Sequence, residues 1–119
     1  MRFGRKKLSD SDYFSQEVSL NELLGLQESD TASLSSVSSA TSSKTLLAAN
    51  PLRLGFIIYN DSDKILYVAF ASTASATAFT YRVVPAATLE VTKGLRYLGK
   101  ITGIWATGVT GSARITEFS

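Results

Sequence analysis

Residues 52–70 read Leu-Arg-Leu-Gly-Phe-Ile-Ile-Tyr-Asn-Asp-Ser-Asp-Lys-Ile-Leu-Tyr-Val-Ala-Phe. Two runs rich in β-branched and aromatic residues, 53–59 and 65–70, flank the polar stretch Asn60–Asp63. This pattern predicts a β-hairpin, because Asn, Asp and Ser side chains satisfy local backbone groups in a tight turn. Both runs are apolar on both faces, and an isolated hairpin is marginal in water. The rest of the chain must therefore supply a sheet around this hairpin, and a partner beyond it.

The overall composition fits one globular domain with an extension. The chain has 119 residues, 45% of them hydrophobic and 18% charged, with a net charge of +2 and no cysteine. A net charge this small does not argue for a nucleic-acid partner. No apolar run is long enough to span a membrane, and the basic start lacks the apolar run of a secretory signal. We expect no direct nucleic-acid or membrane partner, and a protein compatible with a reducing cytoplasm.

The first 36 residues predict an extended N-terminal arm. Its tip, residues 1–7, is basic, and every charge between residues 8 and 43 is acidic. Residues 19–22 have the spacing of a helix capping box, so a short helix is expected before a Ser-rich linker. Such a short helix is unstable alone and forms only against a partner. The residues expected to bind that partner are Arg2, Arg5, Lys6, Lys7, Tyr13, Phe14, Leu20, Leu23 and Leu24.

The remainder of the chain alternates short apolar runs with turn residues. The connections are too short for the helical crossovers of a parallel sheet. We therefore predict an all-β fold, with a body of seven to eight short strands at residues 37–119 that forms an antiparallel β-sandwich or jelly-roll-like structure. In the 78–84 strand, alternation predicts that Phe79, Tyr81 and Val83 share the buried face. The expected strands cover residues 34–39, 45–48, 53–59, 65–70, 78–84, 88–91, 101–107 and 112–118.

The residues that usually carry catalysis or bind metals are missing. The chain has neither histidine nor cysteine, which removes Ser-His-Asp and Cys-His arrangements and most zinc sites. Nothing in the pattern of the carboxylates suggests the shaped cleft that a catalytic pair needs. We expect no catalytic residue, no cofactor and no metal, and thus no enzyme. Arg53, Arg82, Arg96 and Arg114 lie on different elements, so we expect them in solvent or at an interface and not in a nucleic-acid-binding stripe.

Three aromatic residues allow an alternative function. Trp105, Tyr97 and Tyr81 could form a stacking platform for a glycan. An aromatic residue inside an apolar strand is more often part of the core, and we expect this for Trp105. A glycan-binding module requires an exposed aromatic cleft, so a buried Trp105 would argue against it.

A series of short motifs runs between about Val37 and Phe118. The motifs are Thr45–Asn50, Ile58–Ser62, Leu66–Val68, Ala71–Ser75 with Phe79-Thr80, Gly103–Ala106 and Gly111–Glu117. Each motif alone is weak, but in its order and spacing the series resembles a set of small β-rich structural proteins of tailed bacteriophages. Residues 89–94 depart from this family, which often has an aromatic-rich segment ending in Glu before a Pro or Gly turn.

The resemblance implies a structural protein of the virion. Such proteins include cement (decoration) proteins, which bind across the seams between capsomers and stabilise the head. It implies a homotrimer on the capsid exterior, made in the host cytoplasm, with the major capsid protein as its partner. The alternative within the same class is a component of the neck, tail or fibre. Copy number separates the two, since a cement protein occurs in hundreds of copies per particle.

Overall fold

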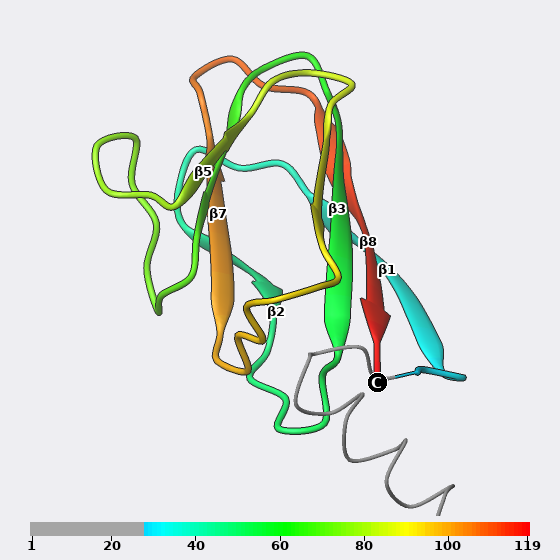
Figure 1. Ribbon diagram of the computed structural model, residues 1–119. Helices are drawn as coiled ribbons and strands as arrows, with labels where there is room; N and C mark the ends of the chain where they lie inside the picture. Colours follow the sequence, from blue (N-terminus) through cyan, green and yellow to red (C-terminus); the bar gives the residue numbers. More distant parts are fainter. Residues whose placement is uncertain (1–27) are drawn as a thin grey trace, which may run out of the picture.

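The computed structural model describes residues 28–119, which form eight strands in two antiparallel sheets (Figure 1). Sheet A has the strand order β1-β8-β3-β6, and sheet B has the order β2-β7-β4-β5. The all-β sandwich expected from the sequence is confirmed, and no helix occurs among the described residues. The strands are β1 (Ala32–Ser38), β2 (Lys44–Leu47), β3 (Gly55–Ser62), β4 (Leu66–Ala69), β5 (Tyr81–Val83), β6 (Thr88–Val91), β7 (Ile101–Trp105) and β8 (Gly111–Phe118).

The strand pairing is that of a jelly roll. β1 pairs with β8, β2 with β7, β3 with β6 and β4 with β5, so the described chain is one long antiparallel ribbon. Alternate pairs along this ribbon belong to opposite sheets, and the β3–β8 and β4–β7 pairings join them within each sheet. This wrapping of paired strands into two packed sheets is the jelly-roll arrangement.

The predicted hairpin at residues 52–70 is wrong in its pairing. Both strands exist, but β3 lies in sheet A between β8 and β6, and β4 lies in sheet B between β7 and β5. The polar residues between them form an arch from one sheet to the other. Each of the two strands is thus central in its own sheet, where both of its edges are hydrogen-bonded, which a two-stranded hairpin could not provide.

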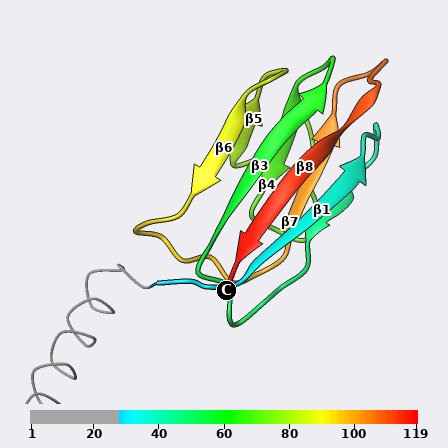
Figure 2. The ribbon, with the colours of Figure 1, turned by 90° about the vertical axis from the view of Figure 1, so that its right-hand side faces the viewer.

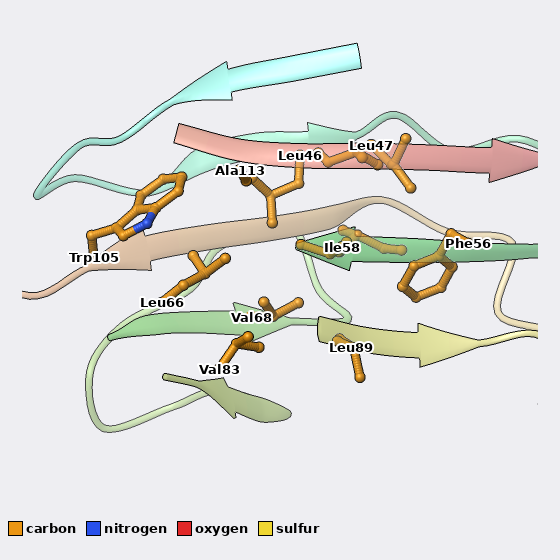
Figure 3. Packing of buried hydrophobic residues seen from close by; sticks show 12 residues of the cluster. Leu46, Leu47, Phe56, Ile58, Leu66, Val68, Val83, Leu89, Trp105 and Ala113 are labelled. Atoms are coloured by element: carbon orange, nitrogen blue, oxygen red, sulfur yellow. The ribbon is translucent and has the colours of Figure 1, made fainter. Parts of the chain in front are cut away.

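The core lies between the sheets and is built from the inward faces of both (Figure 3). Each of these buried side chains stabilises the fold by about 1.5–3 kcal/mol when it is large. Leu46 and Leu66 meet above Gly103, and a Cβ atom on Gly103 would lie 2.8 Å and 2.9 Å from their Cδ1 atoms. The core residues are Leu46, Leu47, Phe56, Ile58, Leu66, Val68, Val83, Leu89, Ile101, Trp105, Ala113 and Ile115.

Strand β5 is shorter than the alternation predicted. It covers Tyr81–Val83, and Phe79 precedes it. Val83 is buried as expected, but Phe79 and Tyr81 are 40% and 46% exposed. The two exposed rings rest on the aromatic rings of β4 and the residue after it, since Phe79 contacts Tyr67 and Tyr81 contacts Phe70. They therefore cover the margin of the sandwich and not its interior.

The edge strand expected near residues 34–39 is present as β1, at the margin of sheet A (Figure 2). It begins at Ala32, so the expected division between arm and body, after residue 36, falls inside a strand. Residues up to 27 lie outside the described part of the chain.

Candidate interaction surface

The residues predicted to bind a partner, from Arg2 to Leu24, all lie outside the described residues. Within residues 28–119 no group of three or more acidic side chains is placed to hold a metal ion, and no helix there could cross a membrane.

Three carboxylates of the body have partners in other strands or loops. Asp61, in β3, accepts a hydrogen bond from Nε of Arg114 at 3.0 Å. Asp63 accepts one from the backbone N–H of Thr110 at 2.8 Å, which lowers the pKa of this carboxyl below its usual value. Glu117 pairs with Arg53 at 2.7 Å. These three acids hold strands and loops together.

The three aromatic residues proposed for a glycan do not come together at the surface: Tyr81 and Tyr97 both contact Phe70, whereas Trp105 is buried in the core. Trp105 is 2% exposed, and its Nε1–H donates to Oδ1 of Asn60 at 3.4 Å. Tyr97 stacks on Phe70 with ring centroids 5.0 Å apart, and its hydroxyl donates to the carbonyl of Lys100. The core position expected for Trp105 is confirmed, and the glycan-binding alternative loses its central residue.

Arg53 is buried, contrary to the expectation that it lies in solvent or at an interface. Its side chain is 1% exposed and donates from Nε to Glu117, from Nη1 to the carbonyls of Tyr97 and Gly99, and from Nη2 to the carbonyl of Ala48. These partners come from β8 and from two loops that lead into and out of sheet B. Burial of a guanidinium is tolerated here because all of its bonds run to fixed acceptors.

The outward face of sheet A carries an apolar strip. In β3 the side chains of Phe56, Ile58 and Asn60 are buried, so Ile57 and Tyr59 point away from the core, and both are half-buried. On the same face Leu34 of β1 is 78% exposed. Thr116 lies between Leu34 and Ile57 in the strand register. We call Leu34, Ile57, Tyr59 and Phe118 the outer strip.

The sequence signalled half of this surface. A run that is apolar on both faces marked Ile57 and Tyr59 as residues in need of a cover. Leu34 gave no such signal, because it stands alone among serines.

Strand β1 leaves one edge of sheet A open. The amide of Ser39 donates to the carbonyl of Gly111, and the amide of Ser119 donates to the carbonyl of Thr31. Every second residue of an antiparallel strand bonds to its partner, so the odd-numbered residues from 31 to 39 bond to β8. The even-numbered residues of β1 therefore direct their N–H and C=O groups away from β8, and no described strand lies beyond them.

The other margins of the two sheets carry features that hinder strand addition. β5 has three residues, β2 has a register shift between Thr45 and Leu47, and β6 has four residues that include Glu90. Short length, irregularity and charge all discourage pairing with another chain. β1 has seven residues and no charge, so it is the margin best suited to accept a strand.

Comparisons of the chain with protein-family models, with curated proteins and with solved structures found no match.

Proposed function

We propose that this protein is a structural component of a tailed-phage virion, a cement protein that binds the major capsid protein across capsomer seams on the capsid exterior. The observation that carries the proposal is the outer strip beside the open edge of β1. It is an adhesive surface on a body in which Asp61, Asp63, Glu117 and the buried polar residues Arg53 and Asn60 hold the fold together.

The jelly-roll architecture is compatible with this function but does not select it. Jelly rolls occur in viral capsid domains and also in lectins and cupins. A lectin of the kind considered above would need Trp105 at the surface, and a metal-binding cupin would use side chains such as histidine, which the chain lacks. Among the functions that a jelly roll can serve, the resemblance of the motif series to phage structural proteins favours a role in the virion.

The binding mode has two parts in this proposal. Copies of the body associate as a homotrimer that buries the outer strip, and the N-terminal arm reaches the major capsid protein. The basic tip binds an acidic patch of the capsid protein. The large apolar residues of the arm supply most of the binding energy, since buried large side chains carry most of the energy of an interface. Three arms on one trimer raise the avidity through effective concentration.

Head binding tests the arm. Heads that lack the protein are mixed with the full chain or with a variant in which Arg2, Arg5, Lys6 and Lys7 are all replaced by Glu. We expect the variant to lose decoration, measured by co-sedimentation. A matched variant with Lys44→Glu and Arg82→Glu, both exposed on sheet B, should bind as the unmodified chain does. Full decoration by the tip variant would refute the proposal.

The outer strip is tested by the oligomeric state. Ile57→Lys places a charge in the middle of the strip without entering the core, so it should convert the trimer to monomers in analytical ultracentrifugation. Thr45→Lys, at an exposed position of sheet B, serves as the control. If the unmodified chain is already a monomer, the trimer proposal is wrong.

A further inference from the structure

A hollow lies at the end of the sandwich where the described chain begins. It has a volume of about 230 Å³ and is lined by Ser29, Leu54, Gly55, Thr92 and Phe118, which we call the end hollow. A second depression shares Leu54 and Gly55 and extends to Leu95 and Arg96. Phe118 belongs to both the end hollow and the outer strip, so the apolar surface of sheet A continues around this end of the molecule.

The chain enters the body at the rim of this hollow. Ser29 lines it, and the hydroxyl of Ser29 donates to the carbonyl of Ser119, which fixes the entry point beside the end of β8. Figures 1 and 2 show residues 28–31 next to the C-terminus. The three preceding residues reach about 10 Å at most, and the six preceding residues about 20 Å. The chain between Ser29 and Leu26, Leu24 or Leu23 is therefore long enough to let these residues reach the hollow.

The chemistry of this preceding segment matches the hollow. Residues 20–28 read Leu-Asn-Glu-Leu-Leu-Gly-Leu-Gln-Glu, an apolar run flanked by acids. The hollow has apolar walls in Leu54 and Phe118, and the exposed Lys93 follows Thr92 at its margin. Arg96 brings a second cation to the adjoining depression. Docking of this segment would bring apolar side chains to apolar walls and acidic side chains to a basic rim.

We propose that the segment Leu20–Leu26 docks on the end hollow of its own chain in the free protein, with Leu23, Leu24 and Leu26 as the buried contacts. The tether of a few residues supplies a high effective concentration, so a shallow hollow is sufficient. This inference deepens the proposed function, because it states where the leucine anchors of the arm lie before the capsid protein competes for them.

A spin label tests the contact in the full chain. The protein contains no cysteine, so Leu52→Cys introduces a single thiol on an exposed loop at this end of the body. With a nitroxide at this site, we expect NMR signals of the amides of Leu20–Leu26 to lose intensity. A label at Thr107→Cys, in the loop between β7 and β8 at the opposite end, should leave them unchanged.

A matched variant distinguishes docking from the proximity that the covalent tether alone produces. Leu23→Ser, Leu24→Ser and Leu26→Ser keep the length and the charge of the segment, so the broadening from the label at residue 52 should decrease if docking causes it. Lys93→Glu should also reduce it. Equal broadening in the triple-serine variant would overturn the proposal.

A mixture of spin-labelled protein and isotope-enriched unlabelled protein, both carrying Ile57→Lys so that the proposed trimer does not bring the chains together, identifies the chain to which the segment binds. Broadening in this mixture would place the segment on a second copy and overturn docking on its own chain. The measurement needs no phage heads, so it can fail while head binding holds, and head binding can fail while the docking is observed.

Discussion

Arg53 and Asn60 stand at opposite ends of β3 and perform the same task with different chemistry. Arg53 precedes the strand and joins β8 to the loops around sheet B through a charged side chain. Asn60 lies near the end of the strand, and its amide nitrogen donates to the carbonyls of Lys64 and Val83 at 2.8 Å each. Its Oδ1 accepts from the hydroxyl of Ser62 and from Trp105. Each residue thus connects the two sheets at one end of the sandwich.

The difference lies in what remains when either residue is lost. Removal of Arg53 leaves the carboxylate of Glu117, 16% exposed, without its cation. Removal of Asn60 leaves only neutral groups. A charge left in a poorly solvated place is destabilised far more than a neutral carbonyl. We therefore expect the two ends of the molecule to differ in how strongly they depend on a single side chain.

The largest effect is expected for Arg53→Met, which keeps the bulk of the side chain. It should lower the free energy of unfolding by about 3–5 kcal/mol, because Glu117 and three carbonyls lose their donor. Urea denaturation measures this loss. Arg114→Met is the matched control, since it breaks the exposed pair with Asp61 and should cost no more than about 1 kcal/mol. Equal losses in both variants would contradict the role given to Arg53.

Asn60→Ala should cost less, about 1–3 kcal/mol, because the carbonyls of Lys64 and Val83 lose a neutral donor. Asn60→Asp retains the shape but places an acceptor opposite these carbonyls, so it should destabilise at least as much as alanine does. If Asn60→Asp is as stable as the unmodified protein, hydrogen bonding is not what holds this end.

A third prediction concerns the coupling within each network. A double-mutant cycle of Asn60→Ala with Trp105→Phe, measured by urea denaturation, should give a coupling free energy of about 0.5 kcal/mol. The coupling is small because the hydrogen bond between the two side chains is long, at 3.4 Å. The corresponding cycle of Arg53→Met with Glu117→Gln should give a larger coupling. A reversed order would remove the distinction between the charged and the neutral end.

The smallest effect is a dependence on pH at the Asn60 end, where Asp63 joins the β3–β4 loop to Thr110. The pKa of Asp63 is lowered from 3.8 in the folded protein, chiefly by the backbone N–H of Thr110. Its stabilising contribution is therefore present above pH 3.8 and is lost as the pH falls through the lowered value. The difference in stability between the unmodified chain and Asp63→Ala should shrink in acid. A difference that grows in acid would contradict this sign.

The sequence predicted the strands better than their pairing. Residues 88–91 form a strand in full, and the 101–107 prediction is confirmed over 101–105, because β-branched and aromatic residues favour a half-buried extended chain. At Asn60–Asp63 the sequence predicts a hairpin turn, whereas the structure has an arch between the two sheets. Four polar residues between two apolar runs serve a hairpin and an arch equally well, and only long-range packing distinguishes them. Asn60 did carry a signal, since it continues the buried alternation of Phe56 and Ile58.

Less of the candidate site could be predicted. A charged side chain such as that of Arg53 is generally expected in solvent. Its burial depends on partners that the local sequence does not reveal: the carboxylate of Glu117 and the backbone carbonyls of two separate loops. Of the outer strip, the sequence pattern indicates only the second apolar face of β3, with Ile57 and Tyr59. The open edge of β1 depends on register, which is fixed by its pairing with β8 and not by its own serine-rich sequence.

One consequence of the ribbon arrangement concerns the order of synthesis. β8 is a central strand of sheet A, inserted between β1 and β3, yet it follows both of them by about fifty residues or more in the chain. A ribosome that has completed β7 has produced a sheet with an empty slot, in which β1 has no neighbour and β3 has one bare side. Until residues 111–118 emerge, this incomplete protein exposes the unpaired backbone groups of β1 and β3 and the core face that β8 will cover, both of which favour aggregation.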